Sequence, residues 1–114
     1  MQTVIEGENY SVEWDPTTRT AALKGILRLN GLLEYAPIAQ FLSGAVPAGS
    51  MTLDLQGLEF LNSSGIATLS KFVITARNHQ GCAITIRGSS SVPWQGKSLN
   101  NLKRLMPDLT LTFD

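Results

Sequence analysis

Apolar residues recur along this chain with two spacings, one typical of strands and one typical of helices. Residues 9–15 and 21–29 place apolar side chains at every second position, which is the period of a strand with one buried face. Between them, the segment DPTTR at 15–19 has the composition of a turn. The chain is therefore predicted to open with a hairpin.

A helix is predicted after the hairpin. Asn30 and Gly31 interrupt the strand pattern, and apolar residues then recur at helical spacing from Leu32 to Leu42, with Asn30 as a candidate cap. Pro37 lacks an amide hydrogen, so we expect it to kink this helix or to make its first turn separate. A loop containing glycine and proline leads on to the next strand.

The middle of the chain changes from strand spacing to helical spacing. Residues 51–56 alternate apolar and polar side chains, and from Ile66 onward the apolar positions lie three or four residues apart. Where the spacing changes stand Asn62, Ser63 and Ser64, whose side chains accept hydrogen bonds from the free amides that open a helix. This run predicts a strand, a loop and a helix.

The last third of the chain adds three more elements. We predict a strand at 83–87, a helix through Leu99 and Met106 that Pro107 ends, and a closing strand at 109–113. The order is then β-β-α-β-α-β-α-β. Helices that alternate with single strands imply a largely parallel sheet.

The predicted fold class is α/β (α+β), with one domain over residues 1–114 and an N-terminal hairpin joined to a mixed, largely parallel sheet. Because there are only three predicted helices, we expect them mainly on one face of the sheet. The chain is long enough to fold as one domain around its own core. The central members of that core are predicted to be Leu53, Leu55, Ile66, Leu69, Val73, Ile84 and Ile86.

Charge, cysteine content and hydropathy limit the function classes. The nine basic and nine acidic residues cancel, and the basic ones are scattered along the sequence, so we expect no binding to nucleic acid. The lone Cys82 allows no internal disulfide and is expected to serve packing in a reducing cytoplasm. No run is apolar enough for a signal peptide or a membrane span, so we expect a soluble cytoplasmic protein that does not insert into membranes.

Enzyme chemistry finds little support. The one histidine, His79, is expected on the same helix as Ser64, roughly 22 Å away at about 1.5 Å per residue, so the two cannot form a catalytic dyad. Gly96-Lys97-Ser98 resembles the end of a P-loop, but Ser91 stands where that motif needs glycine. One histidine and one cysteine make no metal site, and we expect no cofactor.

The start of the central helix is the candidate site. A helix N-terminus carries partial positive charge, so a phosphate added to a hydroxyl there is electrostatically favoured. At about 100° per residue, Ser64 falls on the polar side of the helix and Ser63 falls toward the apolar side. Either this turn is a modification switch centred on Ser64, or its residues only cap the helix.

The segment LDLQGLEFLNSSGIATLSKF, residues 53–72, resembles the signature of STAS domains. These domains form bacterial anti-sigma-factor antagonists and stressosome scaffolds, in which a D-S-S-G turn opens the second helix. The length, the element order and the run from Pro107 to Leu109 are also similar, so the resemblance covers nearly the whole chain. The chain departs from the motif at Asn62, where the family has an acidic residue.

The resemblance implies a non-enzymatic regulatory protein. In antagonists of this family a partner serine kinase of the anti-sigma-factor type phosphorylates the second serine of the turn, and a phosphatase reverses the reaction. That role falls on Ser64, with Ser63 as second choice. The implied partner-binding residues are Asn62, Ser63, Ser64, Gly65, Thr68, Lys71 and Thr75.

Other interpretations stay open at this point. The alternative function is a structural subunit of a larger assembly, such as a stressosome-like scaffold or the soluble component of a lipid transporter. Homo-oligomerisation is compatible with both functions. Trp94 is either a core residue beside the last helix or an exposed anchor for a partner.

Overall fold

Seven strands form one mixed sheet in the computed structural model, which describes residues 2–114. The first three strands are antiparallel neighbours, and the remaining pairs are parallel. The first half of β3 pairs with β4 and its second half with β5, so these two short strands continue one another. The strands are β1 (Gln2–Glu6), β2 (Tyr10–Asp15), β3 (Thr20–Leu27), β4 (Met51–Asp54), β5 (Leu58–Leu61), β6 (Ile84–Gly88) and β7 (Thr110–Phe113).

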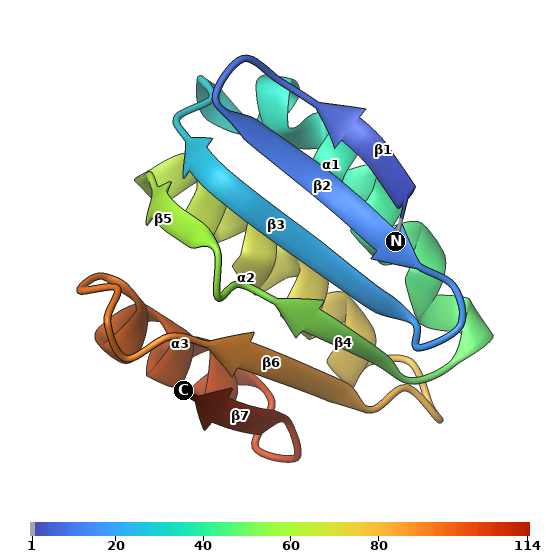
Figure 1. The fold of residues 1–114 in the computed structure, drawn as a ribbon. Helices are drawn as coiled ribbons and strands as arrows, with labels where there is room; N and C mark the ends of the chain where they lie inside the picture. Colours follow the sequence, from blue (N-terminus) through green and yellow to red (C-terminus); the bar gives the residue numbers. More distant parts are fainter. Residues whose placement is uncertain (1) are drawn as a thin grey trace.

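Three helices cover one face of this sheet (Figure 1). They are α1 (Gly31–Ala45), α2 (Ser63–Arg77) and α3 (Gln95–Leu105), and a single 3₁₀ turn, Val46–Ala48, follows α1. The prediction of a largely parallel sheet with an N-terminal hairpin and helices on one face is confirmed.

The core lies between the sheet and the helices. Six of the seven residues predicted at its centre are buried, and only Ile66 is partly exposed at its margin. Cys82 is buried and packs in this core. Trp94 is partly buried against it and donates from Nε1 to the Leu58 carbonyl at 3.2 Å, which favours the core role over an exposed anchor.

Strands β1 and β5 were not predicted from the sequence. β1 lies at the edge of the sheet, where four of its five residues are exposed, so no buried face imposes alternation on its sequence. β5 buries Leu58 and Leu61, which are three residues apart, because its register with β3 shifts near Gly25. Neither strand therefore carries a strand period.

Of the two expectations for Pro37, a kink or a separate first turn, the separate turn is wrong. The helix is continuous from Gly31 to Ala45. Pro37 and Leu33 are both exposed, so the carbonyl that loses its helical bond lies on the solvent side of α1, where the missing donor costs little. Asn30 is the cap residue by position, but it contributes its amide hydrogen, which the Glu34 side chain accepts at 2.9 Å.

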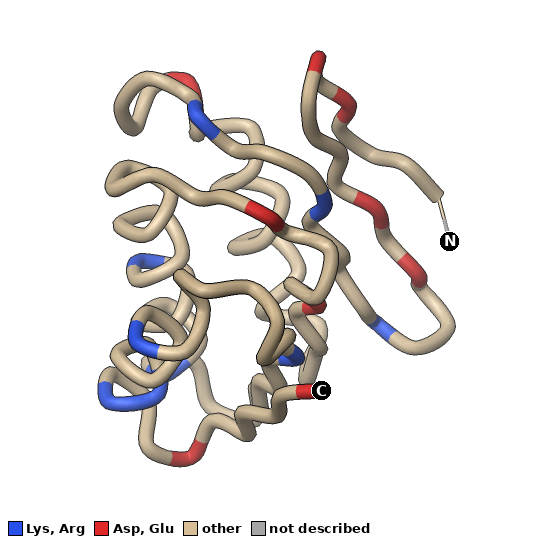
Figure 2. Tube along the Cα trace, turned by 60° about the vertical axis from the view of Figure 1, so that its left-hand side comes forward, with Lys and Arg blue, Asp and Glu red and all other residues tan. Residues whose placement is uncertain are grey.

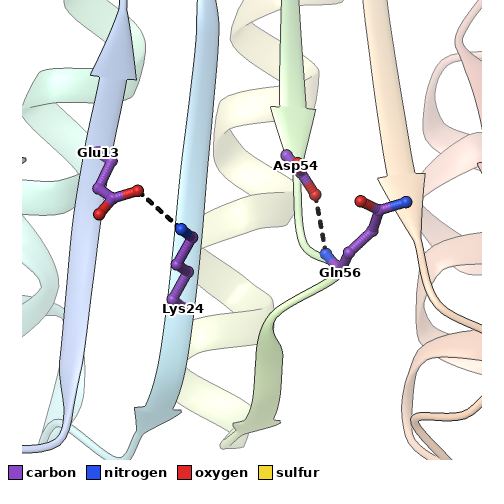
Figure 3. A network of polar contacts seen from close by, with 4 residues as sticks. All are labelled: Glu13, Lys24, Asp54 and Gln56. Atoms are coloured by element: carbon purple, nitrogen blue, oxygen red, sulfur yellow. Dashed lines mark hydrogen bonds and ion pairs between the residues drawn. The ribbon is translucent and has the colours of Figure 1, made fainter. Parts of the chain in front are cut away.

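The opposite face of the sheet is polar. Glu13 and Lys24, from β2 and β3, form an ion pair of 2.9 Å across this face (Figure 3). On β4, Asp54 accepts the amide hydrogen of Gln56 at 3.0 Å and so stabilises the turn that separates β4 from β5. That turn directs β5 toward the start of α2, where the candidate site lies.

Candidate functional site

Asn62 holds the start of α2 in place with both ends of its amide group. Its Oδ1 accepts the amide hydrogen of Gly65 at 3.0 Å, which is the N-cap bond of the helix. The same oxygen accepts the Tyr35 hydroxyl of α1 at 2.6 Å. Its Nδ2 donates to the Leu29 carbonyl at 2.8 Å, just beyond β3. Three separate segments are thereby joined at one side chain.

This geometry gives a reason for asparagine at a position where STAS domains carry an acidic residue. A carboxylate could cap the helix and accept from Tyr35, but it has no hydrogen to donate to Leu29. Replacing the amide nitrogen of Asn62 by a charged oxygen would place two acceptors against each other. Asn62 therefore has a structural role, and it is only partly exposed to a partner.

The two serines are oriented differently from the prediction. Ser63 is exposed and Ser64 is partly buried, whereas the helical spacing was taken to place Ser63 toward the core. The buried side of α2 is centred on Gly65, Leu69 and Phe72, and Ser63 lies about 200° from Gly65 at about 100° per residue. The prediction was wrong because it centred the apolar side on Ile66 and Val73. In the described structure neither serine hydroxyl has a hydrogen-bond partner.

Two predicted partner-binding residues are buried instead. Thr68 is 3% exposed, and its hydroxyl donates to the Ser64 carbonyl at 2.9 Å. At Gly65 an added Cβ would lie 2.2 Å from a Leu61 methyl group and 2.7 Å from the Tyr35 hydroxyl oxygen, so only glycine fits. Gly65 has no side chain to offer, and almost none of Thr68 is exposed. Lys71 and Thr75 are exposed, as predicted.

Leu32 and Leu33 form an apolar surface beside this turn that sequence reasoning missed. Leu33 is 87% exposed and Leu32 is 48% exposed, in the first turn of α1. The prediction counted both only as apolar residues of this helix, and the buried side of α1 is formed by Tyr35, Ile38 and Leu42. Leu33 lies about 200° from Tyr35, so a helical projection centred on Tyr35 identifies it as exposed.

Acidic and basic residues are mixed in the N-terminal third of the chain, whereas a long central segment carries basic residues alone. Figure 2 shows acidic and basic positions together on the N-terminal strands, and mainly basic positions over the helices on the other side. Between Glu59 and Asp108 the chain has no acidic residue. The basic residues of that segment are Lys71, Arg77, Arg87, Lys97, Lys103 and Arg104.

Catalytic and metal chemistry gain no support from the described residues. His79 lies just beyond the end of α2, at the opposite end from Ser64, and its Nδ1 contacts the Gln80 carbonyl at 3.0 Å. Within residues 2–114 no three histidine, cysteine or acidic side chains gather as a metal site. In the same part of the chain, no helix has the length and hydropathy to cross a bilayer.

Comparison with known proteins identifies the fold through structure. No family model matches the chain, and neither does any curated protein sequence. Apo-SiaC from Pseudomonas aeruginosa matches with a TM-score of 0.73 and 13% identity, over 100% of this chain and 99% of SiaC. The chain has a STAS-like fold.

Two further structures share this fold. SiaC in complex with the diguanylate cyclase SiaD, which it activates, matches with a TM-score of 0.63 and 10% identity over all of both chains. An anti-sigma factor antagonist from Mycobacterium paratuberculosis matches with a TM-score of 0.56 and 20% identity, over 95% of this chain and 90% of the antagonist. At such identities the likeness concerns the fold.

Proposed function

We propose that this protein is a non-enzymatic regulatory module that binds a protein partner through the start of α2 and the first turn of α1. The observation that carries the proposal is the 87% exposure of Leu33 in the first turn of α1, the helix that the Tyr35–Asn62 bond ties to the start of α2. An isolated exposed leucine is ordinary on a protein surface, but here Leu32 is exposed beside it. An exposed apolar patch near hydroxyls that a kinase can phosphorylate is suited to a protein contact that phosphorylation regulates.

The structural neighbours support a regulatory function. One of them is an activator bound to a diguanylate cyclase, and another is an anti-sigma factor antagonist. Both are proteins that act by binding another protein. This chain, by the proposal, acts in the same general way on a partner of its own.

The proposed switch is phosphorylation at the start of α2 by a partner serine kinase of the anti-sigma-factor type, reversed by a serine phosphatase. Exposure favours Ser63 as the acceptor, whereas the resemblance of the motif favours Ser64, which is partly buried. A phosphate on either residue is stabilised by the positive end of the helix. The same phosphate weakens a contact shaped for a neutral hydroxyl, because it must lose its hydration.

The proposal is tested by affinity purification from native cells with tagged wild type and two variants. Leu33→Glu places a charge in the proposed surface, while Val4→Glu does the same on β1, where Val4 is 40% exposed. We expect at least one protein to be captured by wild type and by Val4→Glu but not by Leu33→Glu. Equal capture by all three would contradict the proposal. Capture at fixed stoichiometry in one large particle would favour the alternative of a structural subunit.

A further inference from the structure

A groove of about 180 Å³ runs between α1 and α2, next to the proposed binding surface. Both helices contribute to its walls, and its floor combines apolar side chains with small ones. Lys71 is the one charged residue among those that line it. The lining residues are Leu32, Ala36, Ala39, Gln40 and Ser43 from α1, with Thr68, Lys71 and Phe72 from α2.

We infer that this groove binds an amphipathic α-helix of the protein partner, with apolar side chains against Leu32, Ala36 and Ala39 and a carboxylate against Lys71. This inference rests on the proposed function and specifies the chemistry of the partner. It makes the groove, rather than the serine turn alone, the place where the partner is recognised.

The shape of the groove suits a helix. Leu32, Ala36, Ala39 and Ser43 follow one another at spacings of four, three and four residues, so they form one stripe along α1. Three of the four are small, which lets a third helix approach α1 closely. Helices that dock in grooves present anchors at the matching spacing of i, i+3 or i+4, and i+7. The stripe is long enough for about three such anchors.

The charge of the groove selects an acidic partner. Lys71 is exposed, and within residues 2–114 the one ion pair joins Glu13 to Lys24 on the far face of the sheet. No residue of α2 is acidic. The single carboxylate of α1, Glu34, already accepts a hydrogen bond from Asn30. A partner carboxylate beside Lys71 would therefore meet a cation that, in the described part of the chain, forms no ion pair with Glu34, the one acid on these two helices.

A second copy of this chain does not supply such a helix. Its three helices contain one acidic residue between them, Glu34, and α3 carries Lys97, Lys103 and Arg104. Docking α2 or α3 would bring like charge to Lys71, and docking α1 would bring only Glu34, which already accepts a hydrogen bond from Asn30. A flat membrane surface also fits poorly, because the apolar lining is recessed between two helices and a bilayer cannot enter it.

The position of the groove also relates binding of the partner helix to the proposed phosphorylation of Ser64. Ser64 precedes Thr68 by four residues and Lys71 by seven, so the three lie along one side of α2. Ser64 therefore stands at the N-terminal end of the groove. A phosphate there places negative charge where an acidic helix must lie, and so opposes its binding.

The inference is tested with two synthetic helical peptides of about 15 residues. One has leucines at i, i+3 and i+7 flanked by glutamates, and its matched control has lysines in place of the glutamates. Affinities are measured by fluorescence anisotropy, and amide shifts of isotope-labelled protein locate the binding. We expect the glutamate peptide to bind about tenfold more tightly, with shifts at Ala36, Ala39 and Lys71.

Variants of the protein distinguish the groove from the rest of the surface. Lys71→Glu should reverse the preference between the two peptides, whereas Lys97→Glu on α3 should leave it unchanged. Ala39→Trp fills the groove and should abolish binding, while Ala67→Trp, on the exposed side of α2, should not. Circular dichroism verifies that each variant folds. If a tryptophan variant does not fold, the charge reversals at exposed Lys71 and Lys97 still decide the result.

Several results would overturn the inference. They are equal affinity for both peptides, no binding of either, shifts outside the groove, or Leu33-dependent binding to vesicles of anionic phospholipid alone. A cellular partner that depends on Leu33 but ignores Lys71→Glu and Ala39→Trp would overturn it and leave the proposed function standing. Peptide binding as expected, with no Leu33-dependent partner in cells, would instead count against the proposed function.

Discussion

The Tyr35 hydroxyl donates a hydrogen bond of 2.6 Å to the Asn62 side-chain oxygen. Tyr35 is 1% exposed, and the Leu27 carbonyl lies 3.2 Å from the same hydroxyl. The bond ties α1 to the residue that caps α2, so the exposed leucines of one helix and the serines of the other are held in a fixed relation. The proposed binding surface therefore exists before any partner arrives.

Tyr35→Phe tests this bond. The substitution keeps the ring in the core and leaves Asn62 its cap bond to Gly65. We expect the free energy of unfolding to fall by about 1 kcal/mol, the usual net value of one hydrogen bond. Urea denaturation of wild type and variant measures the difference. A loss above about 3 kcal/mol would mean that the hydroxyl holds more of the fold than these contacts account for.

The same pair predicts a dependence on alkaline pH. Burial raises the pKa of Tyr35 above its ordinary value, and a backbone hydrogen bond at Leu29 opposes the change. The folded state thus holds the phenol proton more tightly than the unfolded state does, so stability is lost once the pH exceeds about 10. Unfolding measured from neutral pH upward should show the gap between wild type and Tyr35→Phe shrinking above that value. A constant gap would contradict the burial of this phenol.

Gln95 provides a second test of the architecture. Its side chain is fully buried, accepts from the Ser89 amide at 2.7 Å and donates to the Leu55 and Leu58 carbonyls at 2.6 and 3.1 Å. Gln95→Ala leaves the Ser89 amide without its partner, while the Leu58 carbonyl keeps the Trp94 donor and the Leu55 carbonyl keeps the Leu58 amide, so we expect a loss of about 2 kcal/mol. Asn100→Ala, which removes an exposed contact on the same helix, should cost less than about 0.5 kcal/mol. Thermal unfolding of both variants compares them, and equal costs would refute the role of Gln95.

Charge at the start of α2 should be tolerated by the fold. Ser63 is exposed and occupies the first position of the helix, so Ser63→Asp should stabilise the protein by about 0.5 kcal/mol. Ser64→Asp should be nearly neutral because this residue is partly buried. Both variants should bind a captured partner about tenfold more weakly. Calorimetric titration measures the affinities, and unchanged values for both would leave the turn as a cap only.

The sequence predicted the helices and strands that have one buried face and one exposed face. The strand at 51–56 and the helix after Asn62 were found because a buried face imposes its period on the residues. β1 and β5 were missed because an exposed edge strand and a shifted register impose no such period. A local sequence pattern shows which residues share a face. β1 and β5 instead form by pairing with strands that are their neighbours in space, so no local pattern reveals them.

The candidate site was predicted in position but not in detail. The cap role of Asn62 follows from its place before the helix, whereas its bond to Tyr35 joins residues 27 positions apart and depends on how α1 packs. The predicted orientation of Ser63 was wrong because the buried side of α2 includes Gly65, which packs tightly against Tyr35 and Leu61 and which hydropathy alone does not mark as a core position. For the same reason the exposure of Leu33 became clear only with the fold.

The most direct test of the account replaces Leu33 by a photo-crosslinking phenylalanine derivative in native cells, with the same replacement at Val4 as control. Leu33 stands in the proposed surface, and Val4 lies on β1 at the sheet edge. Illumination should yield one specific protein adduct from position 33 and none from position 4, and Ser63→Asp or Ser64→Asp should reduce it. Adducts from position 4 alone, or equal patterns from both positions, would contradict a binding surface at the start of α1 and α2.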